Sequence, residues 1–176
     1  SVARARELVD LAAGRITTVG VCVNMTQPEL RELKADIGLD WLQLHGDESA
    51  EFVAEMNGQA FKGLGIAIEA DLEAALAMPG ELVLVDARDD IAKGGTGRLA
   101  PTDLARRVAE QRPTVLAGGL RPGNVEERIA AIRPMGVDTA SGVELSPGVK
   151  DAVKVREFCL RARRAFSSVA DGVKDV

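Results

Sequence analysis

The sequence is poor in several residue types that carry particular functions. Its 176 residues include one histidine, two cysteines and 3% aromatic residues. One histidine and two cysteines do not make a convincing zinc site, so we expect no bound metal. Cys22 and Cys159 lie far apart and form no CxxC pair, which is typical of two reduced thiols. With so few aromatic residues, the hydrophobic core must be built from Val, Leu, Ile and Ala.

Charge and hydropathy exclude further classes of protein. The net charge is −5 and the sequence has no block of basic residues, which argues against a nucleic-acid partner. The sequence shows no signal peptide, and its longest apolar runs are too short to cross a membrane. We therefore expect a cytoplasmic protein without a membrane partner. The length predicts one domain over residues 1–166, followed by a frayed tail over 167–176.

Hydrophobic periodicity predicts alternating strands and helices. A helix over residues 1–13 is followed by strands, which we expect at 17–24, 40–45, 59–67, 81–86, 114–117 and 137–140. A helix follows each strand, and the last helix is expected at about 151–165. This alternation is typical of an α/β fold with a parallel sheet. The strand over 17–24 is apolar on both faces, as expected of a strand buried on both sides.

Two architectures have this alternation, and the sequence favours the (β/α)8 barrel of TIM-barrel type. The glycine-rich GxGxxG turn of many doubly wound sheets is absent after the first strand. Polar residues instead follow nearly every strand, and in a barrel all these strand ends face one mouth. A complete barrel has eight strands, whereas we find six βα units here. Because the chain starts on a helix, we expect about two βα units to be missing from its N-terminus.

The ends of the last two strands predict a phosphate site. Gly118 and Gly119 follow one strand, and Ser141 and Gly142 follow the next. Such turns offer free backbone N–H groups and a hydroxyl, and barrels commonly bind phosphate at this position. The Ser146-Pro-Gly148 segment could start a short helix, whose positive end would add to the attraction for an anion.

Asp86 is the first candidate for chemistry, because it lies where the apolar 82–85 segment ends. A carboxyl group there could act as a general acid or base, or it could cap the next turn or pair with Arg88. The long loop that follows contains Gly94, Gly95, Thr96 and Gly97. That segment could close over a ligand, or it could be an ordinary flexible loop.

Three further polar residues lie at strand ends. Gln43 and His45 are two residues apart and therefore share one face of their strand. A lone histidine is usually structural, but its place at a strand end also suits ligand binding. Asp138 could hold sugar hydroxyls or could order its loop. Cys22 lies inside an apolar strand and is expected to be a core residue.

A set of short motifs follows in a fixed order along about residues 4 to 166. These motifs are Val19-Gly-Val-Cys-Val-Asn24, Gln43-Leu-His-Gly-Asp-Glu48, Val85-Asp86, Gly94-Gly-Thr-Gly97, Leu116-Ala-Gly-Gly-Leu120, Asn124, Gly136-Val-Asp-x-x-Ser-Gly-Val-Glu144 and Pro147-Gly-Val-Lys-Asp151. Together they resemble the phosphoribosylanthranilate isomerase family, whose members are TIM barrels of tryptophan biosynthesis.

The resemblance implies an Amadori rearrangement without metal or organic cofactor. N-(5-phosphoribosyl)anthranilate would become 1-(2-carboxyphenylamino)-1-deoxyribulose 5-phosphate. Asp86 matches the family's acid, and the two glycine turns match its phosphate loops. Gly94–Gly97 matches a loop over the substrate. Gln43 and His45 would lie near the anthranilate, and Asp138 on the sugar side.

The chain departs from the family in its catalytic base. The family's base is a cysteine in a Lys-Ile-Cys-Gly type motif on the first strand, and no segment here matches it. The first strand, first helix and second strand have no counterpart. An alternative is therefore a phosphosugar-binding remnant without catalysis. Another alternative is a different phosphosugar barrel of tryptophan or histidine biosynthesis, which the Gln43–Glu48 motif disfavours. An incomplete barrel would also expose strand edges and could self-associate.

Overall fold

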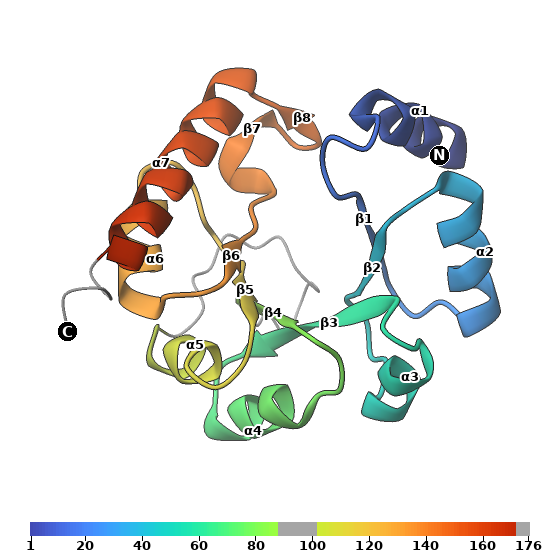
Figure 1. Cartoon of the computed structure of the whole chain (residues 1–176), viewed down its shortest axis with the longest axis horizontal. Helices are drawn as coiled ribbons and strands as arrows, with labels where there is room; N and C mark the ends of the chain where they lie inside the picture. Colours follow the sequence, from blue (N-terminus) through green and yellow to red (C-terminus); the bar gives the residue numbers. More distant parts are fainter. Residues whose placement is uncertain (88–101, 172–176) are drawn as a thin grey trace. The chain divides into compact units, whose positions relative to one another are not determined.

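A computed structural model describes residues 1–87 and 102–171 of the chain (Figure 1). Helices and strands alternate along it, as the periodicity predicts. The elements are α1 (Val2–Ala12), β1 (Val19–Cys22), α2 (Gln27–Ile37), β2 (Trp41–Leu44), α3 (Ala50–Glu55), β3 (Ala60–Ile66), α4 (Glu69–Ala77), β4 (Val83–Ala87), α5 (Thr102–Ala109), β5 (Thr114–Leu116), α6 (Val125–Ile132), β6 (Gly136–Val137), the 3-10 helix η1 (Ser141–Val143), β7 (Glu144–Ser146), β8 (Val149–Lys150) and α7 (Ala152–Asp171).

Strands β1 to β6 form one sheet in which each strand is hydrogen-bonded to the next strand along the chain. The pairs β1–β2, β2–β3 and β5–β6 are parallel, with Val19 opposite Trp41 and Val115 opposite Gly136. A doubly wound sheet reverses its strand order at a switch point, whereas a (β/α)8 barrel keeps the sequence order. The sequential order of these six strands confirms the predicted α/β fold of TIM-barrel type.

The chain divides into two compact units, and the first comprises residues 1–63 and 77–83. Helix α1 packs against α2 in this unit (Figure 1). Its aliphatic core is built from residues of β1, α2, β2, α3 and β3, in line with the scarcity of aromatic residues. The buried members of this core are Cys22, Leu30, Leu42, Leu44, Val53, Met56 and Ala60.

Strand β1 differs from the expectation that both of its faces are buried. Cys22 is buried, but the side chains of Val19, Val21 and Val23 are 43%, 63% and 50% exposed. Helix α1 likewise has no buried residue, although its periodicity is amphipathic. Residues of β1 alternate between two faces, and the face that carries Val19 and Val21 is left uncovered by the described residues. The apolar sequence therefore predicts the strand correctly, but its prediction that both faces are buried is wrong.

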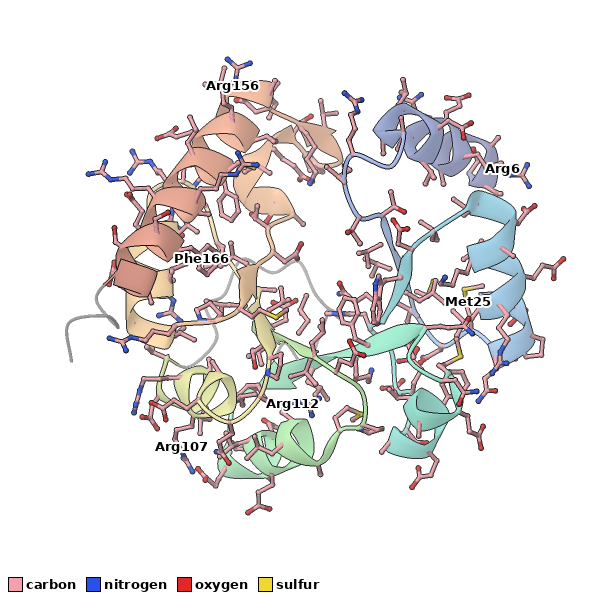
Figure 2. The ribbon with its side chains drawn as sticks, viewed as in Figure 1. Arg6, Met25, Arg107, Arg112, Arg156 and Phe166 are labelled. Carbon is pink, nitrogen blue, oxygen red and sulfur yellow. The ribbon has the colours of Figure 1, made fainter. Side chains whose placement is uncertain are left out.

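The second unit comprises residues 64–76 together with the described residues from Leu84 onward. Two arginines bind helix α4: Arg107 of α5 bonds Glu69, and the half-buried Arg112 donates to the Ala75 carbonyl at 2.9 Å (Figure 2). Its core joins the inner faces of α4 to α7 with β4 and β5. The buried members include Ile66, Leu72, Leu84, Val85, Val108, Leu116, Val125, Ile129, Ile132 and Phe158.

The prediction of a short helix that starts at Ser146 is wrong. Strands β7 and β8 form an antiparallel hairpin there, with Ser146 opposite Val149, so Pro147 and Gly148 make the turn. Gly148 has φ +79°, and Pro followed by a residue with positive φ is the pattern of a type II turn. The short helix lies earlier, as the single 3-10 turn η1.

Helix α7 is longer than the periodicity predicts. It continues to Asp171 rather than ending near Ala165, because its apolar side continues through the buried Ala165 and the half-buried Phe166 (Figure 2). Part of the segment expected to fray is therefore helical, and residues 172–176 lie outside the described residues. No helix in the described part of the chain is both long and apolar enough to cross a bilayer.

Candidate functional site

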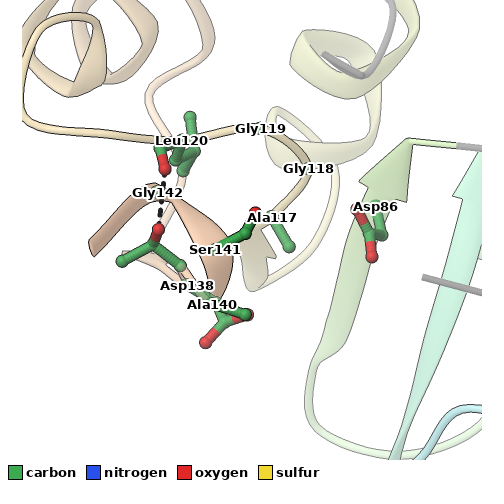
Figure 3. A pocket seen from close by; sticks show the side chains of 10 residues that line it. Asp86, Ala117, Gly118, Gly119, Leu120, Asp138, Ala140, Ser141 and Gly142 are labelled. Atoms are coloured by element: carbon green, nitrogen blue, oxygen red, sulfur yellow. Dashed lines mark hydrogen bonds between the residues drawn. The ribbon is translucent and has the colours of Figure 1, made fainter. Parts of the chain in front are cut away.

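The ends of β4, β5 and β6 line one pocket in the second unit (Figure 3). Asp86 comes from β4, directly after the fully buried Val83–Val85 segment. The strand ends are tied by backbone hydrogen bonds, from Ala117 to the Val85 carbonyl at 2.7 Å and from Asp138 to the Leu116 carbonyl at 2.8 Å. The pocket is lined by Asp86, Ala117, Gly118, Gly119, Leu120, Asp138, Thr139, Ala140, Ser141 and Gly142.

The turn after β5 depends on glycine for its backbone conformation. Gly118 and Gly119 have φ +89° and +65°, in the region that L side chains rarely adopt. Asn124 braces this turn, because its Oδ1 accepts from the Arg121 N–H at 2.8 Å and its Nδ2 donates to the Gly119 carbonyl at 3.1 Å. Gly118 and Gly119 both line the pocket, and successive peptide groups of a turn are a common way to bind an anion.

The turn after β6 depends on glycine for a different reason, which is close contact. A Cβ atom on Gly142 would lie 1.8 Å from the Leu120 carbonyl oxygen and 2.7 Å from Oγ1 of Thr139. That Thr139 hydroxyl donates to the same carbonyl oxygen at 2.6 Å (Figure 3). The loops after β5 and β6 therefore touch through backbone atoms, and only a residue without a side chain fits at Gly142.

Lys150 of the hairpin lies beside the pocket, in an ion pair with Glu144. Its ammonium donates to the carbonyl of Ala140, a pocket residue, at 2.7 Å, and to Oε1 of Glu144 at 2.8 Å. The hydrogen bond from Lys150 lowers the pKa of Glu144 and outweighs the opposite effect of burial. A negative net charge of the whole chain does not exclude an anion site, because backbone N–H groups act on an anion at short range.

The first unit carries the Gln43 and His45 pair. Nε2 of Gln43 lies 3.1 Å from Nδ1 of His45, so the two side chains share a strand face as predicted. The ring also lies against Gly63, where a Cβ atom would stand 2.3 Å from Nδ1. Cys22 is buried in the core, and burial, with a smaller effect from Glu48, raises the pKa of its thiol.

Six of the predicted site residues line a single pocket: Asp86, Gly118, Gly119, Asp138, Ser141 and Gly142. Gln43 and His45 belong to the other unit. The Gly94–Gly97 segment lies outside the described residues. Within residues 1–87 and 102–171, no group of three or more His, Cys, Asp or Glu side chains is placed to hold a metal ion.

Comparison with known proteins decides the family. Residues 2–161 match the family described as N-(5'-phosphoribosyl)anthranilate isomerase. The chain belongs to this family. It is 40% identical over 152 residues to the isomerase of Pelobacter propionicus, an alignment that covers 86% of this chain and 73% of that protein. The resemblance read from the short motifs is thereby confirmed.

Solved isomerase structures agree with the fold. The Thermotoga maritima isomerase matches with a TM-score of 0.84 and 30% identity, covering 93% of this chain and 80% of that one. An isomerase bound to reduced 1-(o-carboxyphenylamino)-1-deoxyribulose 5-phosphate matches with a TM-score of 0.80 and 30% identity, covering 93% of this chain and 79% of that one.

Two structurally important residues of this family member were missed by the sequence patterns. Thr139 bonds the Leu120 carbonyl nineteen residues before it, and no periodic pattern in the sequence indicates a contact at that separation. Lys62 lies inside an apolar strand, where periodicity predicts a core residue, and its side chain is 4% exposed in an ion pair with Glu48. The available signal was a lysine in the otherwise apolar Ala60–Ile66 segment.

Proposed function

We propose that this chain binds N-(5'-phosphoribosyl)anthranilate and acts in its Amadori rearrangement to 1-(2-carboxyphenylamino)-1-deoxyribulose 5-phosphate. The observation that carries the proposal is the pocket of the second unit, which combines the Asp86 carboxyl group with two glycine turns. Family membership over residues 2–161 supports the same reaction. A phosphate site and a carboxyl group in one pocket are what a phosphorylated sugar requires.

Asp86 is proposed as the general acid. Protonation of the ribose ring oxygen lets the C1′–O bond break while the nitrogen lone pair forms a Schiff base at C1′. A base then removes the C2′ proton, and the resulting enolamine tautomerises to the ketone. Asp86 lines the pocket at the end of β4, which places a carboxyl group beside the proposed phosphate site, where a general acid is required.

The glycine turns are proposed to anchor the phosphate. Gly118, Gly119, Ser141 and Gly142 would offer N–H groups and a hydroxyl to the phosphate. Asp138 lines the same pocket and is proposed to bind the sugar hydroxyls. Gln43 and His45 are proposed to contact the anthranilate ring, as the family resemblance implies.

Turnover also requires a base to remove the C2′ proton. No segment of the 176-residue sequence matches the Lys-Ile-Cys-Gly motif that carries the family's base. Cys22 does not replace that base, because it is a core residue whose thiol pKa is raised. We therefore propose that full turnover needs this motif in addition to the residues described here.

The test compares the 176-residue chain with a fusion that adds the N-terminal region of the Thermotoga maritima isomerase. We expect both proteins to bind reduced 1-(o-carboxyphenylamino)-1-deoxyribulose 5-phosphate and only the fusion to turn over substrate. In the fusion, Asp86→Asn should lower kcat by at least about 100-fold and retain binding. Asp10→Asn, at an exposed position of α1, is the matched control. Full turnover by the 176-residue chain would contradict the requirement for the cysteine motif, and normal activity of Asp86→Asn would contradict the acid.

A further inference from the structure

A buried ion pair in the first unit has no part in the mechanism described above. Lys62 of β3 and Glu48, which follows β2, lie with Nζ and Oε2 2.9 Å apart. Their side chains are only 4% and 3% exposed. Burying charges is unfavourable unless they are paired and fully hydrogen-bonded, and replacement of such pairs by apolar groups is often tolerated. A fully satisfied pair at a strand end therefore calls for an explanation beyond stability.

The lysine ammonium binds the backbone on both sides of His45. It donates to the carbonyl of Gly46 at 2.7 Å and to the carbonyl of Leu44 at 3.4 Å, in addition to Glu48. An ammonium has three N–H donors, so these acceptors use all of them. The N–H of His45 is itself held by the Cys22 carbonyl at 2.8 Å. The backbone around the chain's single histidine is thus fixed from two sides.

The glutamate completes the same arrangement from the neighbouring loop. Its carboxylate accepts from the backbone N–H of Asn24 at 2.7 Å and of Gly46 at 2.9 Å. Burial alone would raise the pKa of Glu48, but its hydrogen bonds, among them those from Lys62 and Asn24, and the charge of Lys62 together outweigh burial and leave the pKa below its ordinary value. The carboxylate therefore stays charged and ties the loop after β1 to the loop after β2.

The His45 ring rests on the residue that follows the lysine. A Cβ atom on Gly63 would lie 2.3 Å from Nδ1 and 3.0 Å from Cε1 of the ring. The ring therefore occupies the space above Gly63, and Nε2 of Gln43 lies 3.1 Å from the same Nδ1. The position of the ring depends on the spacing between the β2 end and β3, which the lysine spans.

We propose that Lys62 is a positioning residue that holds the His45 ring over Gly63, in the orientation that receives the aromatic part of the substrate. The inference rests on the proposed function, because it assigns His45 to substrate binding. The lysine itself would not contact substrate, since it is buried and its donors are bound to Leu44, Gly46 and Glu48.

The test uses the double variant Lys62→Met/Glu48→Gln, which removes both buried charges together and leaves neither unpaired. The control is Arg6→Met/Asp36→Asn, which removes an exposed ion pair between α1 and α2 of the same unit. The first readout is the nuclear Overhauser effect between His45 Hε1 and the Gly63 Hα protons. The ring signal needs no assignment, because the chain has one histidine.

The second readout compares two ligands by calorimetry. In the Lys62→Met/Glu48→Gln variant we expect loss of the Overhauser effect and at least tenfold weaker binding of reduced 1-(o-carboxyphenylamino)-1-deoxyribulose 5-phosphate. Affinity for inorganic phosphate should remain within twofold, because the proposed phosphate residues lie in the other unit. The control should change neither readout. Equal loss for both ligands would indicate general damage and overturn the positioning role.

Persistence of the Overhauser effect in a folded double variant would also overturn the proposal. If the double variant does not fold, Lys62→Gln/Glu48→Gln replaces it, since both side chains are then neutral and can still hydrogen-bond to each other. Loss of the Overhauser effect in that variant would support the role of the lysine, and its persistence would overturn it. A parent chain that binds no reduced product would refute the proposed function alone, because the Overhauser effect is measured without ligand.

Discussion

Substitution of Gly142 by alanine tests the geometry of the pocket most sharply. The new Cβ atom would lie 1.8 Å from the Leu120 carbonyl oxygen, whereas real Cβ atoms essentially never approach closer than 3.0 Å. The two loops must therefore separate by about 1.2 Å, as the difference between these distances requires. The clashing atom is backbone oxygen, so no side-chain rotation relieves the contact.

The expected cost follows from what the displacement breaks. Overpacking typically costs about 1–3 kcal/mol, and loss of the Thr139 hydroxyl bond to the Leu120 carbonyl adds about 1 kcal/mol. We therefore expect the free energy of unfolding to fall by about 2–4 kcal/mol. A hydrogen bond to a charged group contributes about 1.5–3 kcal/mol, so displacement of one phosphate donor should weaken phosphate binding by about 10- to 100-fold.

Urea unfolding and calorimetry with inorganic phosphate measure the two effects. The midpoint of unfolding should fall without a change in the slope m. Gly123→Ala is the matched control, because nothing lies within 4 Å of its Cβ position. If Gly142→Ala keeps parental stability and phosphate affinity, the close approach of these loops and their role in binding are both wrong.

Two further predictions concern the first unit. The folded-state pKa of Glu48 lies below the ordinary 4.5, so its stabilisation is present above that pH and is lost as pH falls through the folded-state pKa. The urea midpoint should consequently fall more between pH 5 and pH 3 for the parent chain than for Lys62→Met/Glu48→Gln. An equal fall of the midpoint in both proteins would contradict this prediction. The exposed Val21 on β1 predicts concentration-dependent self-association by size-exclusion chromatography, which Val21→Lys should reduce, whereas a parent chain that stays monomeric at all concentrations would contradict it.

The fold followed from local patterns to a large extent. Strand and helix periodicity predicted the alternation, and the polar residues after each strand favoured a barrel, whose sequential strand order the structure confirms. Pro147-Gly148 was interpreted wrongly, because proline is common both in the first turn of a helix and at the second position of a type II turn. The choice depends on pairing between Ser146 and Val149, which a local pattern does not contain.

The site was predictable where chain geometry alone brings residues together. The ends of parallel strands lie at one edge of a sheet, so Asp86, Asp138 and the glycine turns could be expected near each other. The contact of Gly142 with Leu120 and the ion pair of Lys62 with Glu48 join residues that are 22 and 14 positions apart. Such contacts depend on loop conformation and on the depth of burial, which spacing in the sequence does not specify.

The most direct test of a phosphosugar site is a calorimetric titration of the 176-residue chain with reduced 1-(o-carboxyphenylamino)-1-deoxyribulose 5-phosphate. We predict binding of one molecule per chain, competition by inorganic phosphate, and a loss of affinity of about 10- to 100-fold in Gly142→Ala but not in Gly123→Ala. Absence of binding, or binding that neither phosphate nor Gly142→Ala weakens, would contradict the assignment of this pocket as the substrate site.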